Sequence, residues 1–216
     1  MTDGPTTPTP PPGGMPGAPG PSLVDRAKNI IVSPKTEWPR IDAEPATIGG
    51  IYTSYVMILA AIPPVALALG LILFLPSGVT AYGMVFGITT TSIIVGAVLQ
   101  YGLALASVYI IALIIDALAP TFGSTKNQLQ AFKVAAYYPT ALWVASILLI
   151  IPGIGFLAML AGGIYSLYLL YLGLPVLMKT PADKVVGYFV VTLIVAIVVL
   201  GITNAIVNRV IYGGMF

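Results

Sequence analysis

The residues best placed to do chemistry in this sequence are two polar side chains inside a long apolar stretch. Gln100 and Asp116 lie within residues 83–118, where Asp116 is the only charged residue. A glutamine near the middle of a membrane costs free energy unless it bonds another helix or water, so we expect Gln100 to face inward. Asp116 lies near the end of the stretch, which favours a solvated or helix-end carboxylate over the alternative of a cation or proton site.

Tyrosines supply a second set of candidate polar groups. Tyr165, Tyr168 and Tyr171 recur every three residues, which places their hydroxyls along a slowly winding line on one helix. Because buried tyrosines usually find a hydrogen-bond partner, the pattern favours pegs between helices. The alternative is the lining of a route for a polar solute or a lipid headgroup. Tyr138 joins these candidates together with Pro139, which bends the start of its helix.

The composition removes most of the groups that enzymes use. The chain has 216 residues with no cysteine and no histidine, and 7% of its residues are charged against 58% that are hydrophobic. The sequence contains no paired carboxylates, phosphate-binding glycine loop or nucleophile with a base at a catalytic spacing. We therefore expect no catalytic, cofactor-binding or metal site. The net charge of +2 is scattered over segment ends, which argues against a nucleic-acid partner.

The chain is predicted to begin with two segments outside the membrane. Residues 1–21 are rich in proline and glycine and are expected to form a disordered tail. Residues 22–48 are expected to be a cytoplasmic interfacial segment that starts with a short amphipathic helix, which Ser33 and Pro34 terminate. We expect Trp38 to anchor this segment among the lipid headgroups, where tryptophan is enriched.

The remaining domain, residues 49–216, is predicted to be an all-α bundle of five membrane-spanning helices, each long enough to cross about 30 Å of hydrocarbon. The stretch from 83 to 118 could cross once or twice, and the positions of Lys and Arg decide between the two. With one crossing, eight of the 9 cations lie on one side, which is the cytoplasm by the positive-inside rule. Residues 82–91 then form an interfacial or re-entrant approach. The predicted spans are residues 51–75, 92–118, 134–151, 156–178 and 185–207.

Two further patterns indicate how the spans pack. Pro63 and Pro64 remove two backbone donors from the first span, which predicts a kink whose freed carbonyls need partners from another helix or a polar cavity. A strip of small residues, Ala158, Gly162 and Ser166, recurs every four residues and lets a neighbouring backbone approach closely. That neighbour is either another helix of the chain or a second copy of the protein, so a homo-oligomer is one expectation.

Several motifs resemble those of the Yip1-domain family. They are SPKTEW at 33–38, YYPTALW at 137–143, IPGIGFL at 151–157, YSLYLLYLGLPVLMK at 165–179 and ADKVVGY at 182–188. The resemblance implies a five-helix membrane protein with a cytoplasmic N-terminus. Eukaryotic members are implicated in vesicle trafficking and contact Rab-type GTPases, but the Asp-Leu-Tyr-Gly-Pro motif of that branch is absent here. The chain is therefore similar to the prokaryotic branch.

These observations leave two functional classes, with an intramembrane enzyme as a remote third. The favoured class is a non-enzymatic scaffold or membrane-organising protein in a prokaryotic cell membrane. Such a protein would contact the lipid bilayer and recruit protein partners through its cytoplasmic N-terminal region, with its C-terminus outside. The alternative is a small transporter or channel for an ion, a polar solute or a lipid. It would use Gln100, Asp116, the kink at Pro63 and Pro64, and the tyrosines.

Overall fold

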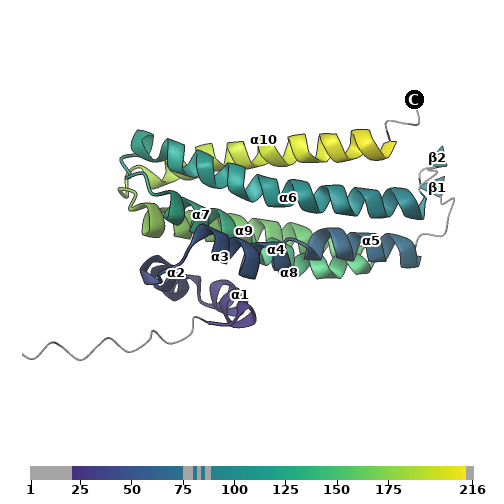
Figure 1. Cartoon of the computed structure of the whole chain (residues 1–216), viewed down its shortest axis with the longest axis horizontal. Helices are drawn as coiled ribbons and strands as arrows, with labels where there is room; N and C mark the ends of the chain where they lie inside the picture. The colour runs from purple at the N-terminus through teal and green to yellow at the C-terminus, as the bar shows by residue number, and fades with distance from the viewer. Residues whose placement is uncertain (1–20, 75–79, 82–83, 86–88, 213–216) are drawn as a thin grey trace, which may run out of the picture.

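The computed structural model describes residues 21–74, 80–81, 84–85 and 89–212 of the chain. Within them the long helices lie lengthwise beside one another in an elongated bundle (Figure 1). Strands β1 and β2 add only a two-residue antiparallel ladder, in which Thr80 pairs with Val85. The elements are α1 (Leu23–Val32), α2 (Pro34–Ala43), α3 (Ile48–Ile51), η1 (Tyr52–Val56), α4 (Met57–Leu59), α5 (Ile62–Phe74), β1 (Thr80–Ala81), β2 (Met84–Val85), α6 (Thr90–Leu118), η2 (Ala119–Phe122), α7 (Gln128–Tyr137), α8 (Thr140–Ala145), η3 (Ser146–Ile150), α9 (Ile154–Met178) and α10 (Val185–Tyr212).

Five of the helical stretches are long and apolar enough to cross a membrane, which confirms the prediction of an all-α bundle with five spans. The second span is the unbroken helix α6, followed by η2, and so crosses once. Part of the predicted approach over residues 82–91 lies outside the described residues; at its end Thr89 caps α6 through a capping box with Ser92. The spans cover Ile48–Phe74, Thr90–Phe122, Gln128–Ile150, Ile154–Met178 and Val185–Arg209.

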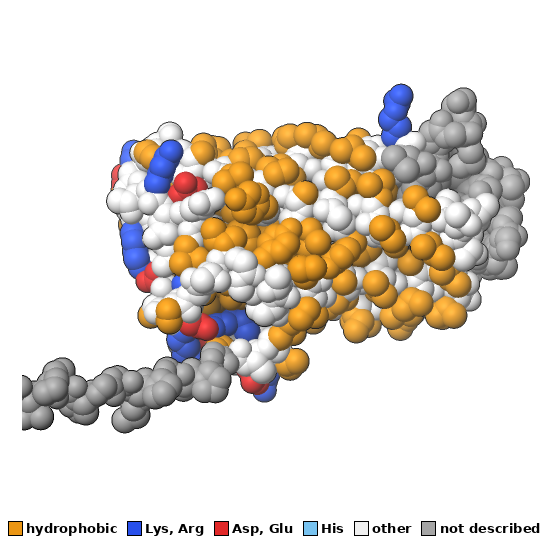
Figure 2. Space-filling model, in the orientation of Figure 1, with side chains coloured by type: hydrophobic (Ala, Val, Ile, Leu, Met, Phe, Trp, Pro, Cys, Tyr) orange, Lys and Arg blue, Asp and Glu red, His pale blue; other side chains and the backbone are white. Residues whose placement is uncertain are grey.

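The two ends of the bundle differ in charge. Lys, Arg, Asp and Glu side chains gather at the end where α1 and α2 lie, and hydrophobic side chains cover the visible flank (Figure 2). We call this the charged end; it includes Asp116 near the end of α6, Lys133 on α7 and Lys179 after α9. At the opposite end α5 stops, α6 starts and Arg209 lies on α10. The apolar flanks of the five spans contact the lipid bilayer.

The first span is interrupted by its two prolines. Pro63 and Pro64 follow a turn at residues 60–61, and both lie in the first helical turn of α5. Proline has no N–H to donate, so carbonyls one turn earlier lose their helical partners. The hydroxyl of Tyr101 on α6 donates to the carbonyl of Met57 at 2.9 Å. The segment just before the interruption is therefore bonded to a neighbouring span.

Helices α8 and α9 approach each other closely through the strip of small residues. A Cβ added to Gly162 would lie 2.6 Å from a side chain of α8, and Ala158 is half-buried on the same helix. Ser166 Oγ accepts a hydrogen bond at 3.0 Å from the backbone N–H of Leu142. That N–H belongs to the first turn of α8, just after Pro139, where it has no partner within the helix. The neighbour of Gly162 and Ser166 is thus a helix of the same chain.

The N-terminal helices lie against one side of the bundle near its charged end (Figure 1). The side chain of Ser22 caps the start of α1, and Ser33 lies between the end of α1 at Val32 and the start of α2 at Pro34. The prediction that Trp38 anchors among lipid headgroups is wrong, because its side chain is 0% exposed. A Cβ added to Gly173 of α9 would lie 2.8 Å from the indole ring. Trp38 therefore belongs to the protein core, in a space that only a glycine on α9 provides.

Candidate functional site

The densest set of polar groups lies where the N-terminal unit, residues 22–47, meets the bundle. Arg26 on α1 is 5% exposed and Glu37 on α2 is 1% exposed, and Arg26 Nη1 lies 2.5 Å from Glu37 Oε1. The other guanidinium nitrogen donates to Glu44, which follows α2. The guanidinium carbon is also 5.7 Å from the ring centroid of Tyr137 on α7. One planar cation thus joins α1 to a carboxylate of α2, to the carboxylate that follows α2 and to the third span.

A second buried cation attaches this unit to the bundle. Lys133 on α7 is 2% exposed, and its ammonium donates to the carbonyl oxygen of Ile41 at 2.6 Å and of Glu44 at 2.7 Å. Carbonyls at the end of a helix have no partners within it and carry the negative end of its dipole. Lys133 therefore caps α2 from the third span.

Exposed contacts continue the connection to α9. Asp42 pairs with Lys179 and accepts a hydrogen bond from Gln130 Nε2 at 3.1 Å. Lys179 ends α9 in a left-handed conformation, with φ of 53°. Since its side chain is 62% exposed, this ion pair contributes little stability compared with the buried pairs of Arg26.

The buried cluster is suited to positioning. Removing one partner of a buried ion pair leaves an uncompensated charge, at a cost of about 3–5 kcal/mol, so the pairs of Arg26 strongly specify how α1 and α2 pack together. Sequence reasoning misses the cluster because it places Arg26 and Glu44 in an interfacial segment and Lys133 just before a predicted span, where charged side chains are ordinarily exposed to water. The one available signal is the density of opposite charges between residues 25 and 44.

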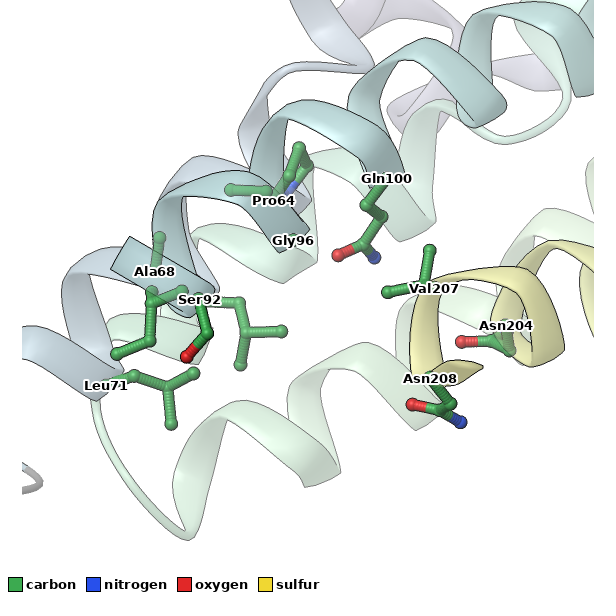
Figure 3. A pocket seen from close by; sticks show the side chains of 12 residues that line it. Pro64, Ala68, Leu71, Ser92, Gly96, Gln100, Asn204, Val207 and Asn208 are labelled. Atoms are coloured by element: carbon green, nitrogen blue, oxygen red, sulfur yellow. The ribbon is translucent and has the colours of Figure 1, made fainter. Parts of the chain in front are cut away.

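Gln100 lies at a pocket of about 180 Å³ between α5, α6 and α10, in the half of the bundle toward the opposite end. In Figure 3 its amide points from α6 toward α10, where Asn204 and Val207 lie, and Pro64 lies on the other side. The structure thus brings two of the predicted residues, Gln100 and Pro64, to one place. Ser92 adds a hydroxyl to the lining. The pocket has room for a few water molecules, each of which occupies about 30 Å³ in the liquid.

The other predicted polar residues lie elsewhere. Asp116 is half-buried at the charged end, and its Oδ1 atom is buried without a hydrogen-bond partner among the described residues. The hydroxyl of Tyr165 donates to the carbonyl of Ile31 at 2.6 Å, which fastens the end of α1 to α9. Tyr168 and Tyr171 are 39% and 41% exposed. One tyrosine is therefore a peg between helices, and the three do not line a common passage.

Tyr138 and Pro139 line a separate cavity of about 390 Å³ between α6, α8, α9 and α10. Most of its lining is apolar, including Trp143. Its two serine hydroxyls are already bonded, Ser107 to the carbonyl of Leu103 at 2.7 Å and Ser166 to the first turn of α8. The cavity therefore resembles hydrocarbon more than a polar site. In the described part of the chain, no group of three or more His, Cys, Asp or Glu could hold a metal ion.

A bundle with apolar flanks and with its ionic groups near its ends is a multi-pass integral membrane protein. Within this class, residues 28–203 match the model of the Yip1 domain, and the chain belongs to the Yip1 family. The match confirms the resemblance inferred from the motifs.

Two relatives of the chain are bacterial. Both are called inner membrane protein YohC, one from Escherichia coli strain K12 and the other from Escherichia coli O6:H1 strain CFT073. Each is 29% identical over 186 residues, which cover 82% of this chain and 91% of the relative. They agree with the similarity to the prokaryotic branch. No solved structure matched the chain.

Proposed function

We propose that the chain is a non-enzymatic scaffold whose N-terminal unit presents a fixed surface to protein partners at the membrane. The contacts of Arg26 and Lys133 support this role, because Arg26 joins α1 to α2 and Lys133 holds the end of α2 against the third span. Lys28 and Lys35 are exposed on the same unit and offer positive charge to a partner or to anionic lipid.

The observation that carries the proposal is the apolar layer that separates the Gln100 pocket from the charged end. Gln100 and Asp116 are sixteen residues apart on α6, or about 24 Å at 1.5 Å per residue. Between them, the side chains of Val108, Ile111 and Ala112 are buried in the core. An ion or polar solute moving between the Gln100 pocket and the charged end would have to cross this layer, which favours a scaffold over a channel.

We orient the N-terminus toward the cytoplasm and the C-terminus outside. Cations concentrate at the charged end, and cytoplasmic loops of membrane proteins carry an excess of Lys and Arg. The name of the two relatives places them in the inner membrane, which supports a prokaryotic cell membrane for this chain. Labelling of cysteines introduced at Lys126 and Arg209 tests the orientation: a membrane-impermeant reagent should reach position 209 in intact cells and position 126 only after lysis.

A flux experiment tests the scaffold directly. The full chain is reconstituted into vesicles, and proton, sodium, potassium and small-solute fluxes are compared with those of protein-free vesicles. We expect no increase and no difference between the wild type and the Gln100→Leu variant. A flux that Gln100→Leu or Asp116→Asn abolishes, and that Tyr168→Phe leaves intact, would contradict the scaffold proposal and show that the protein is a transporter.

Photocrosslinking in cells tests the recruitment of partners. A photoreactive residue at exposed Lys35 should give a reproducible crosslink to another protein, and one at lipid-facing Ile197 should give none. Crosslinks at Ile197 to a second copy of the chain would instead assign a homo-oligomer to this face. Absence of protein crosslinks at Lys35, Lys28 and Thr36 alike would remove the N-terminal unit as the recruiting surface.

Transport remains the second candidate because of the pocket at Gln100. Gln100, Asn204 and Asn208 bring three amides from two spans to one pocket, and Ser92 adds a hydroxyl. Polar groups within membrane spans commonly mark substrate pathways. The flux experiment with Gln100→Leu separates this role from the scaffold.

A further inference from the structure

A second polar pocket lies at the charged end, where the N-terminal unit meets the beginning of the first span and α7. Its volume is about 230 Å³. Arg26 and Glu44 both line it, with side chains 6% and 33% exposed. Thr47 and Tyr137 add hydroxyl groups to the lining. An apolar ligand would remove these charged and hydroxyl groups from water without offering them a hydrogen bond, so the pocket favours a polar one.

The charges in this pocket select a ligand that carries both signs. Arg26 and Glu44 are already paired with each other. A simple anion at Arg26 would displace Glu44 and leave its carboxylate without a cation, and a simple cation at Glu44 would do the reverse. A zwitterion replaces the Arg26–Glu44 pair by two pairs, one between its anionic group and Arg26 and one between its cationic group and Glu44. Arg26 keeps Glu37 as a second partner at 2.5 Å throughout, so the exchange never leaves a buried guanidinium alone.

The contacts of Glu44 and Thr47 are compatible with such an exchange. The backbone carbonyl of Glu44 is held by Lys133 at 2.7 Å, while its side chain is one-third exposed and can turn. Thr47 Oγ accepts a hydrogen bond from the N–H of Gly50 at 3.0 Å, which leaves the hydroxyl hydrogen of Thr47 available to a ligand. One fixed cation, one movable anion and a hydroxyl donor are therefore in place.

The position of the pocket points to the membrane surface. The first span begins at Ile48, and the apolar residues Leu23, Ala46 and Ile51 line the same pocket. A ligand with a charged head and an apolar remainder fits this combination. Phospholipid amine headgroups carry a phosphate and an ammonium a few bonds apart at the depth where a span leaves the hydrocarbon.

We propose that this pocket binds a phosphoethanolamine group. The phosphate accepts hydrogen bonds from Arg26, Thr47 and the hydroxyl of Tyr137, and the primary ammonium donates to Glu44. A quaternary amine has no N–H and cannot make the last contact. The group is supplied either by phosphatidylethanolamine or by its soluble ester, glycerophosphoethanolamine. The site is independent of whether the bundle acts as a scaffold or a transporter.

Native mass spectrometry of the full chain in mild detergent tests the proposal. Phosphatidylethanolamine, phosphatidylcholine and phosphatidylglycerol with identical acyl chains are added at equal concentration. We expect phosphatidylethanolamine to bind most. Glu44→Gln should lower its affinity about tenfold, the effect of one lost charge-assisted hydrogen bond, and should leave phosphatidylglycerol binding unchanged.

A variant that fills the pocket provides the second arm. Ser54 lines the pocket, and its hydroxyl bonds the carbonyl of Gly50 at 2.7 Å. Thr53 makes the same kind of bond to Gly49 at 2.9 Å but does not line the pocket, so Thr53→Leu is the matched control. Ser54→Leu should abolish the preference for phosphatidylethanolamine, and Thr53→Leu should preserve it.

Competition with glycerophosphoethanolamine identifies the source. Displacement of the lipid at equal concentration assigns the site to the soluble ester, and displacement only at large excess assigns it to the membrane lipid. Equal binding of phosphatidylglycerol and phosphatidylethanolamine by the wild type would overturn the proposal. So would phosphatidylethanolamine binding that survives both Glu44→Gln and Ser54→Leu.

Discussion

The buried cations Arg26 and Lys133 at the charged end and the pocket of Gln100 toward the opposite end use polar side chains in contrasting ways. At the charged end, Arg26 and Lys133 are buried and bonded to other elements of the fold, Arg26 to Glu37 on α2 and Lys133 to the carbonyl of Ile41 near the end of α2. At the Gln100 pocket, the glutamine amide has no hydrogen-bond partner among the described residues, and Asn204 bonds only the carbonyl of Leu200 on its own helix. Burial with a full set of partners makes a polar group structural. A partly exposed polar group without such partners, such as Gln100, can be replaced or can take a ligand.

The largest effect should come from Arg26→Ala. This change leaves the carboxylate of Glu37, which is 1% exposed, without its main cation, and should lower the free energy of unfolding by about 3–5 kcal/mol. Denaturant titration or steric trapping in lipid bicelles measures the difference. Lys35→Ala, which removes an exposed cation from the same unit, should change it by less than about 0.5 kcal/mol.

The double variant Arg26→Met with Glu37→Met sharpens this test. Replacing both partners of a buried pair by apolar residues is often neutral, so much of the lost stability should return. Equal stabilities for Arg26→Ala and Lys35→Ala would contradict a structural role for the cluster.

Gly173→Ala should have the next largest effect. The added Cβ would lie 2.8 Å from the Trp38 ring, and overpacking of this kind costs about 1–3 kcal/mol. Gly201→Ala on α10 is the control, because a Cβ there meets nothing within 4 Å. Near-ultraviolet circular dichroism should show a changed Trp38 environment in the first variant alone. An unaltered spectrum and stability would mean that the N-terminal unit is not held against α9.

Tyr101→Phe should destabilise the fold by about 1 kcal/mol. It removes the hydroxyl that bonds the carbonyl of Met57 at the interruption of the first span, a typical net value for one hydrogen bond. Tyr171→Phe, at a side chain that is 41% exposed, should leave the unfolding free energy unchanged. Identical losses for the two tyrosines would show that the interruption does not need its neighbour.

Gln100→Leu should have the smallest effect, within about 0.5 kcal/mol of the wild type or slightly stabilising. An apolar residue in this pocket loses no hydrogen bond to the described residues and avoids the cost of an amide in hydrocarbon. The same unfolding measurement decides the matter. A loss above about 2 kcal/mol would show that Gln100 is as structural as Arg26, and the contrast between the two ends would fail.

The spans could be predicted because the signal for them is local and additive. Uninterrupted apolar stretches give the length of each helix, and the one-sided distribution of cations decides that residues 90–118 cross once. The small residues of the strip containing Gly162 likewise predict, from the sequence of one helix alone, that a neighbouring backbone packs closely against that helix. It does not say which helix makes that contact, because small residues fit many neighbours.

The contacts at the charged end could not be predicted, because the residues that meet there are far apart in the sequence and their partners are groups found throughout any chain. Trp38 meets Gly173, and Lys133 bonds backbone carbonyls of Ile41 and Glu44, which any residue type would provide. A lysine beside an apolar helix and a tryptophan before a span both carry the average signature of a membrane interface. Only the three-dimensional arrangement distinguishes a buried contact from an exposed anchor.

The contact between Trp38 and Gly173 has a consequence for the order in which the chain is made. The two residues are 135 positions apart, so at about 5–20 residues per second a ribosome needs about 7–27 seconds to reach the second after the first. Arg26 and Glu37 are only 11 positions apart and can meet soon after synthesis. The N-terminal unit can therefore assemble early. Its Trp38 indole stays uncovered until the fourth span, which carries Gly173, has been made and inserted. Biogenesis therefore has a vulnerable interval during which an insertase or chaperone would find that surface open.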